Sequence, residues 1–178
     1  MAKTKTKPAS AAGNPNLTAR LPEFDPGTGL SSTACADIAA SLGLVLADSF
    51  LLFIKTLGVH WNVAGASFHG LHVLTEAQYA ELFAAIDDIA ERIRALGHKA
   101  PASPGSYAGM SRIVDADELI DTGQQVVMLV HDNGLICQTL RMALEIADDH
   151  DDIVTVDLLT RRLAAHEKHM WMLRMQMA

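Results

Sequence analysis

The stretch from His60 to Gly97 reads HWNVAGASFHGLHVLTEAQYAELFAAIDDIAERIRALG, and it decides the fold. Four potential metal ligands in it form two pairs with i,i+4 spacing, His72 with Glu76 and Asp87 with Glu91. On an α-helix each pair lies on one face, about one turn apart. At roughly 100° per residue the four side chains fall within about 100° of one another, so they form one polar stripe on an otherwise apolar helix.

The two pairs are too far apart on such a helix to bind one ion together. Asp87 follows His72 by 15 residues, which is about 22 Å at a rise of ~1.5 Å per residue. Metal–ligand bonds measure only about 2.0–2.3 Å. A second copy packed antiparallel across a two-fold axis would place the histidine end of one helix against the carboxylate end of the other. That arrangement gives two equivalent sites per dimer, each shared between chains.

Apolar residues at helical spacing predict four long helices. The predicted ranges are 32–63, 68–97, 115–147 and 153–175. Gly97 is typical of a left-handed helix end, and Asp115 with Glu118 resembles a capping box that opens the third helix. The acidic run DDHDD at 148–152 separates the last two helices and caps the fourth. Residues 98–114 form a long crossing segment, and the sequence leaves open where it carries a short helix.

Composition limits the chain to one domain in a reducing compartment. A chain of 178 residues with 49% hydrophobic content can bury a substantial core. No uninterrupted apolar run reaches the ~18–20 residues that span a bilayer, so no membrane partner is expected. The basic N-terminus lacks the apolar segment of a secretory signal. Cys35 and Cys137 belong to no motif, and a cytoplasmic location is therefore expected.

The charge is unevenly distributed. The net charge of −7 argues against a folded body that binds nucleic acid generally. The first seven residues, MAKTKTK, carry Lys3, Lys5 and Lys7, and the first acid is Glu23. We expect residues 1–30 to be a flexible basic tail and lead-in, and 31–178 to be the folded domain. The three lysines are DNA-binding candidates, and the alternative is a tail that only aids solubility.

Three motifs resemble one known family. They are K-x4-HWNV-x-G-x2-F-x2-LH-x3-E-x2-Y-x7-D-x2-AERI-x2-LG (55–97), D-x8-D-LL-x-R (148–161) and HEKHMWML (166–173). Together they are similar to the signature of the Dps mini-ferritins, the DNA-binding proteins from starved cells. The likeness covers roughly residues 33–175. It implies an all-α fold, a ferritin-like four-helix bundle with a long crossover between helices two and three, which assembles into a hollow dodecamer.

The resemblance also implies a ferroxidase centre between subunits. No Glu-x-x-His pair suits a di-iron site inside the bundle. The implied catalytic metal ligands are His60, His72 and Glu76 of one subunit, with Asp87 and Glu91 of its two-fold mate. Glu76 departs from family members that have Asp there. Imidazole and carboxylate ligands suit iron as Fe(II), although zinc is an alternative occupant, and Glu91 beside Arg92 and Arg94 could instead form a solvated ion-pair face.

Further roles are implied around this centre. Trp61 and Trp171 match family aromatics that could quench oxidising equivalents, with plain packing as the alternative. Asp148 and Asp157, with Asp152 nearby, match carboxylates of an iron-entry pore, with helix capping as the alternative. Other histidines, including His69, are expected in surface or interface positions. That set is His69, His98, His131, His150, His166 and His169.

The sequence thus predicts a homo-oligomeric ferroxidase and iron store that oxidises Fe(II) with hydrogen peroxide or oxygen and protects DNA. The main alternative is a nucleoid-associated, DNA-compacting protein that acts through the lysine-rich tail, because many weak tails add up. A third alternative is a helical scaffold without chemistry, in which Asp87 and Glu91 could be replaced without consequence.

Overall fold

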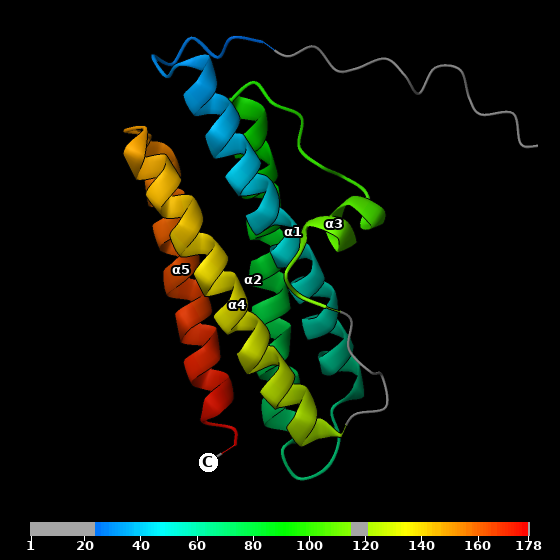
Figure 1. The fold of residues 1–178 in the computed structure, drawn as a ribbon. Helices are drawn as coiled ribbons and strands as arrows, with labels where there is room; N and C mark the ends of the chain where they lie inside the picture. Colours follow the sequence, from blue (N-terminus) through cyan, green and yellow to red (C-terminus); the bar gives the residue numbers. More distant parts are fainter. Residues whose placement is uncertain (1–23, 115–120, 178) are drawn as a thin grey trace, which may run out of the picture.

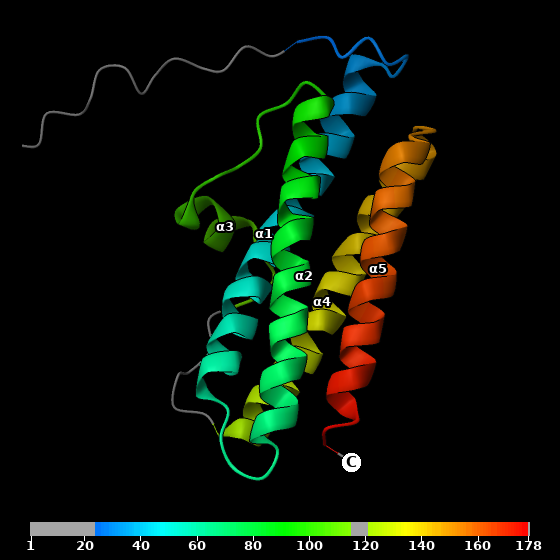
Figure 2. The same ribbon diagram turned by 180° about the vertical axis from the view of Figure 1, so that it is seen from behind.

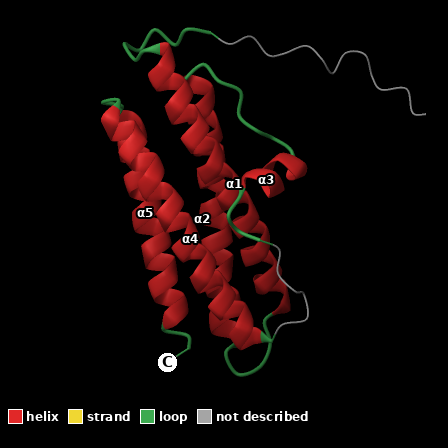
Figure 3. Cartoon of the chain, viewed as in Figure 1, coloured by secondary structure: helices red, strands yellow, loops and turns green. Residues whose placement is uncertain are grey.

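A computed structural model describes residues 24–114 and 121–177 of the chain. Within these residues the secondary structure consists of α-helices, without strands (Figure 3). The helices are α1 (Ser32–Asn62), α2 (Phe68–Ala95), α3 (Pro104–Met110), α4 (Thr122–Asp149) and α5 (Ile153–Arg174). The predicted all-α class is confirmed, and the short helix that the sequence left unplaced is α3.

Four long helices form the bundle, and α3 lies outside it against α1 (Figures 1 and 2). The pair α1–α2 and the pair α4–α5 are antiparallel hairpins, and α1 also packs along α4. The helices α2 and α4 run in the same direction (Figure 1). The contact between α2 and α5 is the smallest among the packed helix pairs.

Side-chain caps fix the starts of α1 and α4. Ser31 Oγ accepts a hydrogen bond from the Ala34 N–H at the start of α1. Asp121 and Gln124 form a reciprocal capping box that opens α4. The pair expected to do this, Asp115 and Glu118, lies outside the described residues. The described helix therefore begins later than predicted, because Asp121 satisfies its first free N–H groups.

The end of α2 holds the lead-in segment in place. Gly97 has a φ of 88°, a conformation that glycine adopts without steric cost. A Cβ atom at this position would also collide with the carbonyl oxygen of Phe24. The Phe24 ring lies 6.0 Å from the Arg94 guanidinium. The glycine predicted as a helix end thus also admits the chain that leads into α1.

The composition of α1 follows from its position as the core helix. By length and apolar content alone it could cross a membrane, but 61% of its most apolar stretch is buried inside the bundle. Its buried side chains include polar ones such as Asp48 and Thr56. A long helix whose apolar residues pack against two neighbours needs no lipid to cover them.

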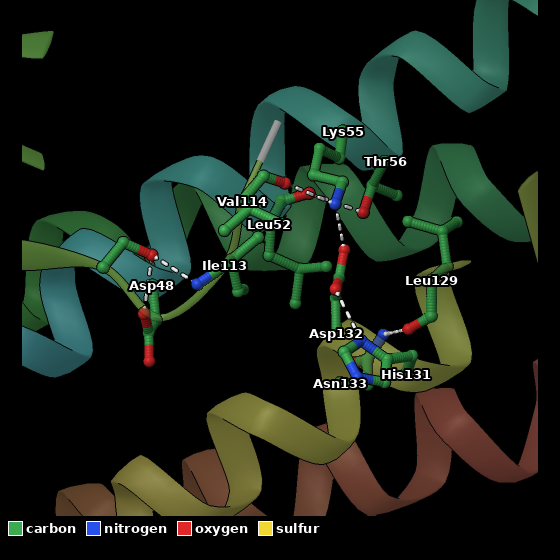
Figure 4. Close-up of polar contacts among 11 residues, drawn as sticks. Asp48, Leu52, Lys55, Thr56, Ile113, Val114, Leu129, His131, Asp132 and Asn133 are labelled. Carbon is green, nitrogen blue, oxygen red and sulfur yellow. Dashed lines mark hydrogen bonds and ion pairs between the residues drawn. The ribbon is translucent and has the colours of Figure 1, made fainter. Parts of the chain in front are cut away.

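Buried polar groups fasten the crossover to the bundle (Figure 4). Asp48 accepts hydrogen bonds from the Ser111 hydroxyl (2.7 Å), the Arg112 N–H (2.9 Å) and the Thr139 hydroxyl (2.7 Å). Further along α1, Lys55 Nζ donates to the Val114 carbonyl at 2.9 Å. Lys55 also forms an ion pair with Asp132, with an N–O distance of 2.5 Å. These contacts hold the crossover against α1 and α4 along one side of the bundle.

Candidate metal centre

His60 and His72 form a prebuilt pair of imidazoles where α1 and α2 meet. Their rings stack with centroids 3.8 Å apart and planes inclined by 20°. Nδ1 of His60 lies 2.9 Å from the carbonyl oxygen of His72, and Nδ1 of His72 lies 2.9 Å from the carbonyl oxygen of His60. Two residues separated by the α1–α2 turn are thus locked together by reciprocal hydrogen bonds.

These bonds decide which ring nitrogen can bind a metal. A carbonyl oxygen only accepts, so Nδ1 of both rings must carry the hydrogen. In the neutral imidazole Nε2 then holds the lone pair, which is the arrangement that metal-binding histidines use. His60 is buried and His72 is half-buried, so the side chains have little freedom to turn away. The pair is preorganised as two nitrogen ligands.

The three candidate carboxylates are exposed on α2. Glu76, Asp87 and Glu91 all face outward from the bundle. The arginines beside Glu91 are engaged elsewhere: Arg92 pairs with Asp152 at 2.7 Å, and Arg94 donates to the His98 carbonyl at 2.9 Å. These contacts weaken the ion-pair alternative for Glu91.

One subunit does not bring the predicted ligands together. Among the described residues no three His, Cys, Asp or Glu side chains are close enough to hold a metal ion. This agrees with the separation expected along α2 and leaves the predicted site to be completed by a second copy. His60 and His72 are the candidate ligands that the fold itself places side by side.

Both candidate aromatic residues are exposed. The exposed fractions are 68% for Trp61 and 59% for Trp171, so packing within the subunit does not account for either. The rings that do contact the imidazole pair are Phe68, stacked on His72, and Tyr79, edge-on to His60. The sequence analysis gave these two rings no role, because their proximity depends on how α2 packs against α1.

The three candidate pore acids differ in environment. Asp148 and Asp157 are exposed, and Asp157 pairs with Arg161 one turn further along α5 at 3.1 Å. Asp152 is buried, accepts two hydrogen bonds from Arg92 and caps α5, which is the capping alternative rather than the pore role. Burial alone would raise the pKa of Asp152, but the hydrogen bonds from Arg92 and Thr155 outweigh it and lower the pKa. Asp148 and Asp157 are left as the pore candidates.

The bundle interior contains a polar cluster built around a cation. Arg162 is buried and forms an ion pair with Glu81 of α2, and it also donates to His166 at 3.2 Å. The other nitrogen of His166 bonds to the Asn133 side chain of α4 at 3.0 Å. The expectation of a surface or interface role for His166 is wrong, since this residue is fully buried. The positive charge of Arg162 would repel a metal cation, so it disfavours metal binding inside the bundle.

Comparison with known proteins agrees with this architecture. Residues 39–178 match the family model for the ferritin-like domain. The chain is 38% identical over 129 residues to DNA protection during starvation protein 2 of Bacillus anthracis, covering 72% of this chain and 88% of the relative. It superimposes on Dps from Bacillus brevis with a TM-score of 0.79 at 30% identity, covering 84% of this chain and all of that one.

A further structural relative is the Dps protein of Vibrio cholerae, described as a member of a broad superfamily of ferritin-like diiron-carboxylate proteins. The TM-score is 0.81 at 28% identity, over 90% of this chain and all of the other. The helix order and these matches lead to one assignment. The chain belongs to the Dps family of ferritin-like mini-ferritins.

Proposed function

We propose that this protein is a ferroxidase and iron store. It oxidises Fe(II) with hydrogen peroxide, or with oxygen, at a site shared between two subunits of a hollow dodecamer. The observation that supports this most is the reciprocal hydrogen bonding of His60 and His72, which leaves Nε2 of each ring as the metal ligand. Glu76 of the same subunit and Asp87 and Glu91 of a second copy complete the ligand set.

The ligand chemistry suits the proposed substrate. Two imidazoles with several carboxylates favour Fe(II) and leave coordination positions for an oxidant. Two Fe(II) ions supply the two electrons that convert one hydrogen peroxide molecule to water, so iron and peroxide are removed together. The exposed carboxylates Asp148 and Asp157 would attract the incoming cations.

The proposal is tested by anaerobic loading with Fe(II), addition of hydrogen peroxide, and size exclusion with iron and protein quantified in each fraction. Many ferric ions that co-elute with a cage-sized protein peak are expected. A cage that retains no iron would contradict the storage function, and a small protein without iron would contradict the shared site.

A second candidate function is DNA binding through the N-terminal tail. The starvation-protein relative from Bacillus anthracis is named for DNA protection, and Lys3, Lys5 and Lys7 form a cationic tail on an otherwise acidic chain. These lysines lie outside the described residues. Deletion of residues 1–7 should abolish DNA retardation and leave iron oxidation unchanged. DNA retardation that survives the deletion, or that is insensitive to salt, would contradict the role of the tail.

A further inference from the structure

Three neighbouring hollows form a groove across the first half of α1. The first, of about 490 Å³, lies beside Phe24 at the end of α2. The second, of about 620 Å³, lies between α1 and the crossover, and the third, of about 670 Å³, lies between α1 and α4. His98 lines the first two hollows, and Ala40 and Met110 line the last two, so each hollow borders the next. We call the three together the α1 groove.

The α1 groove is shallow and apolar where it passes over the helix. Ala36 and Ala40 are exposed there, and Gly43 lies one turn beyond Ala40 in the second hollow. Such small side chains leave room for an extended chain to cross α1. In the third hollow Leu44 and Met142 are exposed by 39% and 52%. Apolar side chains gathered in one hollow are typical of a binding surface.

We propose that the α1 groove binds residues 8–23 of the same subunit. This segment joins the described part of the chain at Phe24, which lines the first hollow, so it starts at one end of the groove. Its sequence, PASAAGNPNLTARLPE, consists mainly of small residues and prolines, with Leu17 and Leu21 as its large apolar side chains. Proline restricts the backbone, which lowers the entropy that the segment loses when it is ordered in a groove.

The charges of the groove and of the segment are complementary in order. Lys99 lines the second hollow, and the acid Glu23 lies at the start of the groove, next to Phe24. The exposed Asp37 and Asp149 line the third hollow. The cations of the N-terminus are farther from the described chain than its acid is, and they are Arg20, Lys7, Lys5 and Lys3. A segment that follows the groove from Phe24 therefore brings its cations toward these aspartates.

The segment is long enough to line all three hollows. Its 16 residues span at most about 55 Å when extended, whereas α1 with its side chains is only about 10–12 Å across. Attachment at Phe24 also gives the segment an effective concentration on the order of mM at the groove. Contacts that are too weak to hold a separate peptide are therefore sufficient to hold this one.

Docking would limit how the tail meets DNA. Lysines drawn toward Asp37 and Asp149 are less available to phosphate groups, so the groove and DNA compete for the same cations. This consequence rests on the proposed DNA-binding function of the tail, whereas the docking itself does not. A variant that blocks the groove should therefore bind DNA more tightly than the wild type.

Photo-crosslinking in the full-length protein tests the docking. A benzophenone amino acid replaces Leu17, and cages are assembled from equal amounts of ¹⁴N- and ¹⁵N-labelled protein. Mass spectrometry should find crosslinks to residues 36–44, 98–106 and 139–150, with both peptides of each crosslink carrying the same label. Ala40→Phe, which fills the groove where it crosses α1, should reduce these crosslinks. Ala164→Phe is the matched control, because Ala164 is exposed on α5 outside the groove.

The docking and the DNA-binding function can fail separately. Crosslinks outside the groove, crosslinks that join different labels, or crosslinks that Ala40→Phe leaves unchanged would overturn the docking. If Ala40→Phe does not assemble, the position and labelling of the crosslinks in the parent protein decide. DNA retardation is measured on the same proteins: stronger retardation by Ala40→Phe than by Ala164→Phe supports the competition. Loss of retardation in every protein would contradict the DNA-binding function and leave the crosslinks to decide the docking.

Discussion

At the scale of single residues, the reciprocal bond between His60 and His72 gives the sharpest prediction. His72→Ala removes one proposed ligand and also the donor to the His60 carbonyl. We expect iron affinity to fall by at least the roughly 10–100-fold that loss of an outer-shell partner alone costs. Isothermal titration with Fe(II) under anaerobic conditions measures this. His69→Ala is the matched control, because His69 is exposed on the same helix, and equal affinities in the two variants would contradict the assignment.

His166 predicts how stability depends on pH. Burial, followed by the nearby charges of Arg162 and His169, holds the pKa of His166 well below 6.5. Below pH 6.5 the imidazole of His166 therefore binds a proton in the unfolded chain but not in the folded chain, so the free energy of unfolding falls as pH falls. The expected slope is about 1.4 kcal/mol per pH unit until the folded pKa is reached. His169, whose pKa is lowered first by burial and also by Arg162 and Lys168 despite the opposing Glu81, adds to the same trend.

Urea unfolding of the iron-free protein between pH 7.5 and 5 measures this slope. His166→Gln keeps groups that can bond to Asn133 and Arg162 but removes the titration, so its slope should be shallower. Asp152 acts in a separate pH range. Its lowered pKa contributes stability at higher pH, and this contribution is lost only as the pH falls below the ordinary value of 3.8. Identical slopes for His166→Gln and wild type would show that His166 does not control acid stability.

At the scale of helices and loops, Asp48 is predicted to hold the crossover on the bundle. Its buried carboxylate accepts three hydrogen bonds, two of them from residues 111 and 112. Asp48→Ala would leave the buried Thr139 hydroxyl and two partly buried donors of the crossover without this partner, and an unsatisfied buried group costs about 1–3 kcal/mol. We expect a lower free energy of unfolding and faster hydrogen exchange around residues 111–113. Asp88→Ala, at an exposed position of α2, is the control and should change neither measurement.

The elements differ in how well sequence predicted them, for a physical reason. The ranges of α1, α2 and α5 follow from a local 3.6-residue pattern, and residues such as Gly97 mark their ends. The start of α4 was misplaced because a second capping box, Asp121 with Gln124, follows the pair Asp115 with Glu118 that the sequence analysis chose. The bonds of Asp48, and the cluster of His166 with Arg162 and Glu81, join residues far apart in the chain, and periodicity carries no information about such contacts.

The candidate site was predicted in part for the same reason. The spacing of His72, Glu76, Asp87 and Glu91 along α2 could be read from the sequence, as could the need for a second copy. The stacking of His60 on His72, and the contact of Tyr79 with His60, depend on the packing of α1 against α2. For Asp152 the sequence left a pore role and a helix cap as alternatives, and its burial at the start of α5 favours the cap.

At the scale of the whole molecule, the bundle interior and the outer face of α2 contain different polar groups. Inside, Arg162 supplies a positive charge to Glu81, so that cluster needs no metal. Outside, Glu76, Asp87 and Glu91 remain exposed and one subunit assembles no cluster of three ligands in the described part of the chain. The proposed site, whose ligands His72 and Asp87 lie far apart along α2, calls for an antiparallel partner.

Mixed assembly of two inactive variants tests this sharing directly. His72→Ala lacks an imidazole and Asp87→Ala lacks a carboxylate, so each variant alone should form cages that fail to oxidise Fe(II). In a dimer of one subunit of each kind, one site inherits both defects and the other combines intact His72 with intact Asp87. Random pairing at equal amounts makes about half of the dimers mixed, so about one quarter of the sites should recover. The initial rate of Fe(II) oxidation after co-refolding measures the recovery. A mixture as inactive as its components, although mixed cages form, would mean that His72 and Asp87 do not serve one site across the two-fold axis, whereas recovery near one quarter would require that they do.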